Sequence, residues 1–325
     1  MRRLKKSIII ILLLVISLCF IFDDVDKDTS VKIEKGLSTM QIADILKEND
    51  VIPSKTAFLL SVNFSEYRGK LQYGTFNFSK GDGYFEIIRK LATSGAKKET
   101  VTVTIPEGYS VEKIIKKLVD SGLGTQREYE KALNESYDYE FIKHIKASPE
   151  CNYKLQGFLF PATYEFYTDD TPHTVLNKML KEFERQYNSL GISYDDIYKI
   201  ITKASLIERE AKLDLERSKI AGVIENRLKK DMKLQIDATV AYFISNGLYD
   251  VERVLYSDLE RKSPYNTYKN TGLPVGPICN PGIESIKAAI NPDNHNYLYY
   301  RTDENKKDGS HIFTETFEAH TNANG

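Results

Sequence analysis

The sequence has no tryptophan and few cysteines or histidines. Its 325 residues include 3 Cys, 5 His and no Trp. Three cysteines are too few for a disulfide framework, although a single disulfide between Cys151 and Cys279 stays possible. The histidines are scattered and no Cys-x-x-Cys spacing occurs, so we expect no metal site and no other cofactor.

Neither sign of charge dominates the chain. The formal net charge is −1, from 45 Lys and Arg against 46 Asp and Glu. No basic stripe follows the first six residues, which argues against a nucleic-acid partner. The chain is instead rich in Tyr and Phe, with 21 and 15. These rings are suited to stacking on sugars, and most of them are equally expected in ordinary half-buried packing.

The one long hydrophobic run lies at the N-terminus. Residues 1–6 form a basic tail with two Arg and two Lys, residues 7–22 are almost entirely apolar, and acidic residues begin at Asp23. As a helix this run spans roughly 24 Å, and snorkelling lysines extend it toward the thickness of a bilayer. No small-residue cleavage site follows, so we predict an uncleaved single-pass anchor rather than a signal peptide. The basic tail then lies in the cytoplasm, and the chain after the anchor lies outside the cell membrane.

A pattern of strand, glycine turn and helix recurs after a linker at 23–30. Residues 32–46 contain Gly36 and a Ser38 helix cap, residues 104–118 repeat this order, and residues 73–91 form a looser copy. The pattern resembles the LysM module, a small glycan-binding unit. A plain α+β spacer is the alternative. We predict a LysM-like region over 31–124.

The remainder, 125–325, is predicted to be one catalytic domain of mixed α/β type, which makes the whole chain α+β. Periodicity and turn residues predict a helical pair within 125–148, an aromatic strand at 155–160, helices at about 172–189, 194–212 and 214–230, and a hairpin of 297–301 with 311–313. The irregular segment 263–282 is long for a loop inside a domain, and such loops are usually functional.

Glu208 interrupts the apolar stripe of the second of these helices, for which Ser193 is the predicted N-cap. The stripe follows the helical spacing Ile197, Ile201, Ala204, Glu208 and Ala211. A carboxyl group held against apolar neighbours favours its protonated form, which a general acid requires. The alternative is a partly exposed Glu208 paired with Lys212 or Arg209.

Several ordered motifs match a known family. The segment 204–210 is followed by four others and by 309–313 near the end; the four are 234–240, 263–268, 272–278 and 280–282. Together they resemble the MltG (YceG-like) family of endolytic murein transglycosylases, and the resemblance covers nearly the whole chain.

The resemblance implies cleavage of the β-1,4 bond between N-acetylmuramic acid and N-acetylglucosamine in peptidoglycan, leaving 1,6-anhydromuramoyl ends. It maps the catalytic carboxyl onto Glu208, acid first and base second, and leaves Glu210 as the second acid. Glu210 is two helical positions from Glu208 and points away from it, so its expected role is a salt bridge or helix cap. It also implies peptidoglycan strands as substrate, cell-wall synthesis enzymes as partners and no cofactor. The polar candidates for positioning the sugar are Gln235, Asp237, Tyr265, Asn266, Thr267, Tyr268, Asn280 and Glu210.

The chain departs from the family pattern at three positions, and two other functions stay open. Gln156 and Ala162 stand where family members often carry acids, and Ala238 stands where they often carry proline. One alternative function is a catalytically silent peptidoglycan-binding scaffold. The other is a hydrolysing muramidase that uses Asp237 as the second carboxylate an ordinary glycosidase needs.

Overall fold

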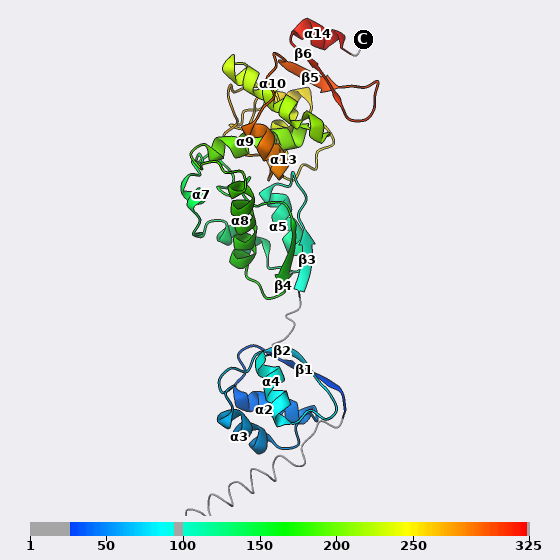
Figure 1. Ribbon diagram of the computed structural model, residues 1–325. Helices are drawn as coiled ribbons and strands as arrows, with labels where there is room; N and C mark the ends of the chain where they lie inside the picture. Colours follow the sequence, from blue (N-terminus) through cyan, green and yellow to red (C-terminus); the bar gives the residue numbers. More distant parts are fainter. Residues whose placement is uncertain (1–26, 94–99, 324–325) are drawn as a thin grey trace, which may run out of the picture. The chain divides into compact units, whose positions relative to one another are not determined.

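The computed structural model describes residues 27–93 and 100–323 (Figure 1). The chain divides into two compact units, Met1–Thr100 and Val101–Gly325. The predicted tail and anchor, residues 1–22, lie outside the described residues. Among the helices of the described ranges, none is long and apolar enough to cross a membrane.

The N-terminal unit encloses a small core of its own. Its strands β1 (Thr29–Ile33) and β2 (Gly74–Phe78) pair antiparallel. Its helices are α2 (Thr39–Glu48), α3 (Lys55–Phe64) and α4 (Tyr84–Thr93). Alternate residues of each strand point inward, so Val31 and Phe76 pack with the buried faces of the helices.

The recurring strand, turn and helix are present in both units. Gly36, at φ +87°, leads to Ser38, whose side chain and Gln41 form a capping box at the start of α2. Gly108, at φ +75°, leads in the same way to Ser110, which caps α5 (Val111–Asp120). The predicted local structure is confirmed.

The two copies nevertheless belong to different units. The strand β3 (Thr100–Thr104) pairs with β4 (Thr163–Tyr167), and α5 shares one hydrophobic core with α8 (Pro172–Asn188). Figure 1 shows α5 and α8 beside these strands. Residues 101–124 therefore pack with the C-terminal unit, whereas the sequence analysis assigned them to the LysM-like region. Core packing, which the repeat does not encode, places the boundary about residue 100.

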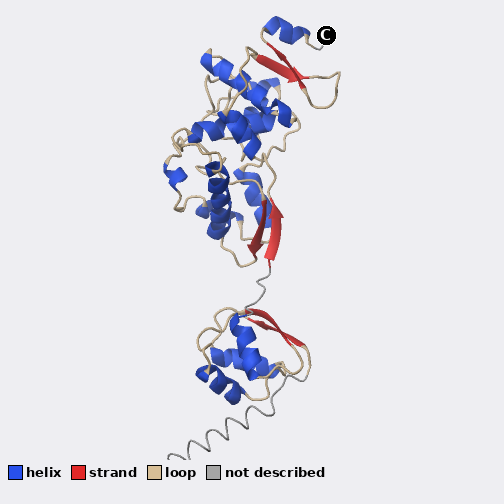
Figure 2. Ribbon diagram, in the orientation of Figure 1, coloured by secondary structure: helices blue, strands red, loops and turns tan. Residues whose placement is uncertain are grey.

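The rest of the C-terminal unit is mainly helical, with three two-stranded sheets in the described chain as a whole (Figure 2). Its remaining elements are α6 (Gln126–Ala132), α7 (Glu140–Lys143), α9 (Ile197–Glu210), the 3-10 turn η1 (Asp214–Glu216), α10 (Arg217–Lys229), α11 (Asp237–Ile244), α12 (Tyr256–Leu259), α13 (Ile283–Ile290), β5 (Tyr299–Thr302), β6 (His311–Thr314) and α14 (Phe317–Asn322). The helix α9 packs against α13 and α10. The α+β class, the three long helices and the β5–β6 hairpin are confirmed.

Two local predictions are wrong. Residues 155–160 form turns rather than a strand, because Gly157 adopts φ +92° and the Phe158 N–H donates to the carbonyl of Leu155. The strand β4 comes after Pro161 instead. The start of α9 also differs: its N-cap is Asp196, while the Ser193 hydroxyl donates to Asp195.

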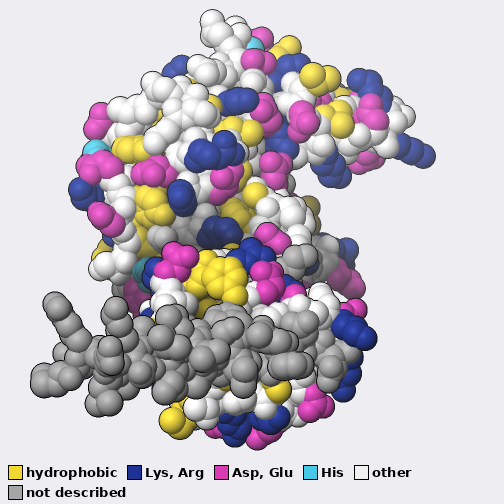
Figure 3. Space-filling view, turned by 60° about the horizontal axis from the view of Figure 1, so that its bottom comes forward, with side chains coloured by type: hydrophobic (Ala, Val, Ile, Leu, Met, Phe, Trp, Pro, Cys, Tyr) yellow, Lys and Arg dark blue, Asp and Glu magenta, His cyan; other side chains and the backbone are white. Residues whose placement is uncertain are grey.

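Charge is mixed over the visible surface. On the face drawn in Figure 3, basic and acidic side chains are interspersed, and neither sign forms a continuous stripe. This agrees with 45 basic against 46 acidic residues in the sequence.

Candidate active site

Glu208 lies on the buried face of α9, as its phase predicts, but its partners are polar. Its side chain is only 7% exposed, and its Oε1 is 3.3 Å from Nη1 of Arg217. Its Oε2 accepts a hydrogen bond of 3.0 Å from the N–H of Gly282. Both carboxylate oxygens are therefore occupied. The prediction of an isolated acid in an apolar seam is wrong, since helical periodicity does not show which distant groups reach the stripe.

A second carboxyl group lies on the same side of α9. Glu107 belongs to the turn before α5, and a Cβ built on Gly282 would fall 1.8 Å from its Oε1. Any side chain at 282 would therefore displace the Glu107 carboxyl group. Burial, followed by the charge of Glu208, raises the pKa of Glu107. Glu208 thus joins the end of α9 to the start of α13, at Gly282, and to the start of α10, at Arg217.

Glu210 stands in different surroundings. Its Oε2 accepts a hydrogen bond of 2.8 Å from the Tyr300 hydroxyl of β5, and within the described ranges its Oε1 has no hydrogen-bond or ion-pair partner. The side chain is half-buried. Burial is the largest influence on its pKa, which is raised, and the charge of Asp237 raises it further. The predicted salt bridge or cap at Glu210 is absent from this part of the structure.

The predicted residues Asp237 and Tyr268 gather on the Glu210 side of α9. Asp237 begins α11 and accepts a hydrogen bond from the Tyr268 hydroxyl. Burial, followed by this hydrogen bond to Asp237, raises the pKa of Tyr268, and the charge of Glu210 contributes as well. Gln235 precedes α11 with an exposed side chain and φ +53°. A non-glycine residue in this region is strained, and such strain concentrates at functional sites.

Arg227 connects the segments that carry these residues. It donates from Nε to the carbonyl of Leu298 and from Nη1 to the carbonyl of Leu234, at 2.6 and 2.7 Å. One side chain of α10 thereby links the strand that carries Tyr300 to the segment that carries Gln235 and Asp237.

Three predicted binding residues are buried supports instead. Asn266 is fully buried and donates to the carbonyls of Leu259 and Arg261. Thr267, 1% exposed, accepts from the N–H of Ile236. Tyr265, 3% exposed, accepts from the N–H of Asn152. These bonds shape the irregular segment that presents Tyr268 and leave little of the three side chains for a ligand.

Asn280 is likewise a structural residue. It is fully buried, and its Oδ1 accepts from the N–H groups of Gly157 and Leu159 at 3.0 and 2.8 Å. Its Nδ2 donates to the carbonyl of Tyr109. One amide thus joins its own segment to the turns at Gly157 and Gly108. Gln156, which stands where family members often carry an acid, is also a structural residue. Its Oε1 caps α5 by accepting a hydrogen bond from the N–H of Val111.

The two cysteines of the C-terminal unit are free thiols. Cys151 lies 2.9 Å from the Tyr198 hydroxyl, and Cys279 donates to the carbonyl of Ser205. The pair that the sequence left open is not formed.

Sequence reasoning missed the partners of both glutamates. Tyr300 entered only as part of a predicted strand, and Arg217 was not singled out. An arginine that begins a helix with a buried side chain needs a counter-charge, which is the signal that points to Arg217. No sequence spacing connects Tyr300 to Glu210.

The chain is similar in sequence to proteins of a known family. A family model described as the YceG-like family matches residues 31–324. A Bacillus subtilis (strain 168) protein named endolytic murein transglycosylase is 38% identical in an alignment 326 positions long, which covers 93% of this chain and 87% of that protein. A protein of the same name from Streptococcus pneumoniae (strain D39) is 27% identical, and the match covers 85% of this chain but 54% of that longer relative.

A solved structure is also similar. The crystal structure of a YceG-like protein from Listeria monocytogenes aligns with a TM-score of 0.58 and 31% sequence identity, over 92% of this chain and 99% of that one. The similarity in sequence and in fold therefore extends over both units.

Proposed function

Since the chain belongs to the YceG-like family, we propose that it is an endolytic lytic transglycosylase of peptidoglycan. It cleaves the β-1,4 bond between N-acetylmuramic acid and N-acetylglucosamine and leaves a 1,6-anhydromuramoyl end. The observation that carries the proposal is the state of Glu210, a half-buried carboxyl group with a raised pKa and, among residues 27–93 and 100–323, one oxygen without a partner. A raised pKa favours the protonated form of this side chain, and its second oxygen is left for a substrate, as a general acid requires.

We assign the acid to Glu210 in preference to Glu208. Transfer of a proton to a sugar oxygen requires hydrogen-bond reach from the carboxyl group. Both oxygens of Glu208 are engaged by Arg217 and Gly282, and its side chain is 7% exposed. Glu208 therefore positions the end of α9 and with it Glu210. Its direct catalytic role stays a prediction that paired variants decide.

The proposed mechanism needs one carboxyl group and no water. Glu210 donates its proton to the glycosidic oxygen as the bond from that oxygen to C1 of the muramoyl sugar breaks. The resulting carboxylate takes the proton of the muramoyl 6-hydroxyl group while the oxygen of that hydroxyl group forms a bond to C1. The proton returns to Glu210, so the enzyme is regenerated. Tyr300 stabilises the intermediate carboxylate by its hydrogen bond.

The polar neighbours hold the substrate. Gln235 and Tyr268 keep accessible side chains beside Asp237, so they are the groups available to sugar hydroxyl and acetamido groups. The Tyr268 ring offers an apolar face to a sugar. Asp237 is already hydrogen-bonded by Tyr268, which favours an orienting role over that of a second carboxylate in hydrolysis.

The product identifies the function. Purified chain is incubated with uncrosslinked peptidoglycan strands, and the fragments are analysed by mass spectrometry. We expect internal cuts whose muramoyl ends are one water lighter than a reducing sugar. Reducing ends show a muramidase, and strand binding without fragments shows a scaffold; either result contradicts the proposal.

We further propose that residues 7–22 anchor the chain in the cell membrane with a cytoplasmic N-terminus, and that the N-terminal unit contacts glycan. The order of β1, α2, α3 and β2 in that unit supports the LysM-like reading. The full chain should sediment with membranes, whereas a chain beginning at residue 27 should be soluble and cleave the same bond. A full chain that stays in the soluble fraction contradicts the anchor. The companion proposal, that cell-wall synthesis enzymes are partners, is tested by crosslinking in intact cells.

A further inference from the structure

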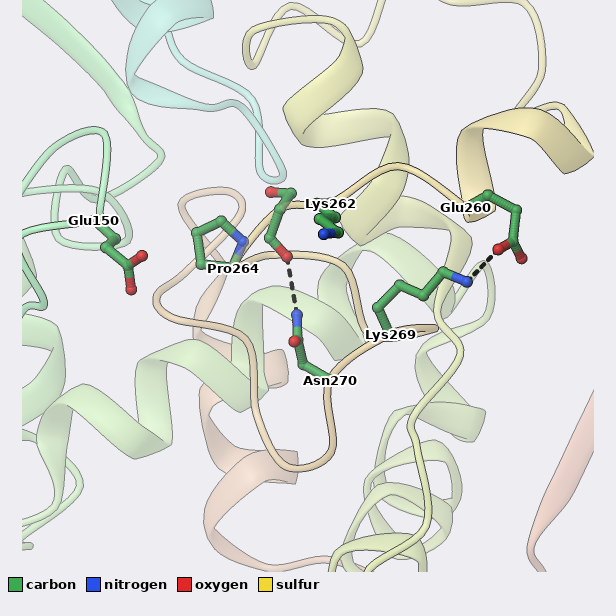
Figure 4. A pocket seen from close by; sticks show the side chains of 7 residues that line it. Glu150, Glu260, Lys262, Pro264, Lys269 and Asn270 are labelled. Carbon is green, nitrogen blue, oxygen red and sulfur yellow. Dashed lines mark hydrogen bonds and ion pairs between the residues drawn. The ribbon is translucent and has the colours of Figure 1, made fainter.

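A polar cavity lies against the segment that presents Tyr268. It has a volume of about 780 Å³ and is lined by Glu150, Glu260, Lys262, Ser263, Pro264, Lys269 and Asn270 (Figure 4). Neither Glu208 nor Glu210 lines it. This volume falls within the range of small-ligand sites, roughly 300–1,000 Å³.

The charges in the cavity are only partly neutralised. Lys269 pairs with Glu260, as Figure 4 shows. Lys262 and Glu150 come from separate segments and have opposite charge. Neither side chain has a hydrogen-bond or ion-pair partner in the described ranges. One free cation and one free anion in a single cavity are complementary to a ligand that carries both a carboxylate and an amine.

The lining also excludes other occupants. It contains no aromatic residue, so it lacks the flat surface on which a sugar stacks. Its apolar contribution is essentially Pro264, which does not suit a lipid chain. A peptide, with main-chain donors and acceptors as well as charges, suits it better.

The cavity is coupled to the active site through one stretch of chain. Asn270 donates from Nδ2 to the carbonyls of Ser263 and Asn266, and so closes the segment 263–270 on itself. Asn266 fixes the same segment from its buried side. Tyr268, which bonds to Asp237, lies between these two asparagines. A ligand in the cavity therefore contacts the same short segment that lines the catalytic side.

We infer that this cavity binds the stem peptide carried by the muramoyl sugar next to the scissile bond. The inference rests on the proposed function. An uncrosslinked stem peptide has free carboxylates and the free amine of a diamino acid, which Lys262 and Glu150 pair with in turn. The cavity thereby makes the enzyme prefer peptide-bearing strands over bare glycan.

The test compares two substrates and two neutral, nearly isosteric substitutions. KM and kcat are measured on uncrosslinked strands with stem peptides, and on the same strands after an amidase has removed the peptides. We expect Lys262→Met and Glu150→Gln each to raise KM for peptide-bearing strands about threefold, and the double variant about tenfold. The kcat and the KM for bare strands should stay within twofold. Lys230→Met, an exposed lysine outside the cavity, is the matched control.

A binding measurement separates this inference from the proposed function. A free stem pentapeptide is titrated into the wild-type chain and the double variant, followed by NMR. We expect saturable shifts in the wild type and about tenfold weaker binding in the double variant. Equal KM for the two substrates in the wild type, or equal peptide binding by the two proteins, overturns the inference. A chain that binds the peptide but cleaves neither strand contradicts the proposed function alone.

Discussion

Glu208 and Glu210 stand two positions apart on α9, and their carboxyl groups have opposite surroundings. Glu208 is buried in an ion pair with Arg217, while Glu210 accepts a hydrogen bond from Tyr300 and has one oxygen with no partner among the residues that the structure describes. A turn of 100° per residue directs the two side chains to nearly opposite sides of the helix. One side therefore serves the packing of α13, and the other serves the proposed chemistry.

Removal of Arg217 should destabilise the fold strongly. Arg217→Met leaves the Glu208 carboxylate buried without its cation, which costs about 3 kcal/mol or more in the free energy of unfolding. Urea unfolding measures the change. The control is Arg185→Met, because Arg185 forms an exposed pair with Glu182 and its loss should cost under about 1 kcal/mol. Equal effects of the two substitutions contradict the structural role of the Glu208 pair.

The turn at Gly157 should tolerate no side chain. A Cβ at this position would lie 2.6 Å from Ile201 and 2.8 Å from Pro277, and φ is +92°. Gly157→Ala is expected to cost about 3 kcal/mol, from overpacking added to backbone strain. Gly191, at φ +67° with open space around it, is the matched control, and Gly191→Ala should cost only about 1 kcal/mol. Thermal unfolding of the two variants separates the packing cost from the backbone cost.

Tyr300→Phe should shift the pH profile of cleavage. The Tyr300 hydroxyl stabilises the carboxylate of Glu210 and thus lowers its pKa, against the larger effect of burial. Its removal raises the pKa of Glu210. If the protonated form is the active acid, the alkaline fall of kcat/KM moves to higher pH in the variant, while the fold is kept. A shift toward lower pH contradicts the assignment.

The stability of the chain should depend on pH through Glu210. Its pKa is raised in the folded state, mainly by burial, above the value of about 4.3 for an unfolded chain. The folded state binds this proton more tightly, so the contribution to stability is fully present below pH 4 and is lost as the pH rises through the folded pKa. The Glu210→Gln variant does not lose this contribution to stability, because glutamine does not ionise. The melting temperature of the variant minus that of the wild type should therefore increase from pH 4 to pH 7, and a flat difference contradicts the raised pKa.

Local structure was largely predictable from the sequence, because caps and periodicity act over a few residues. Ser38 and Ser110 begin their helices, and the stripe from Ile197 to Ala204 is buried. The domain boundary was not predictable from the repeat, since it depends on the core that α5 shares with α8.

The site was predictable only in part, for a related reason. The family motifs pointed to α9 and to the segments that carry Asp237 and Tyr268, which lie on the Glu210 side of this helix. The individual roles depend on partners distant in sequence. Asn280 was predicted to bind sugar. In the structure its amide is buried and forms hydrogen bonds with the backbone of two other segments. The surroundings of Glu208 and Glu210 are set by Arg217 and Tyr300, which no short-range pattern reveals.

The most direct test of the central claim is the yield of anhydromuramoyl product from Glu210→Gln and Glu208→Gln, measured by mass spectrometry with equal amounts of folded protein. We predict that Glu210→Gln loses about 10³-fold in rate, as expected for a lost general acid. Glu208→Gln keeps one acceptor oxygen for either Gly282 or Arg217 and should stay within about tenfold of the wild type. Anhydro product from Glu210→Gln at the wild-type rate would contradict the account.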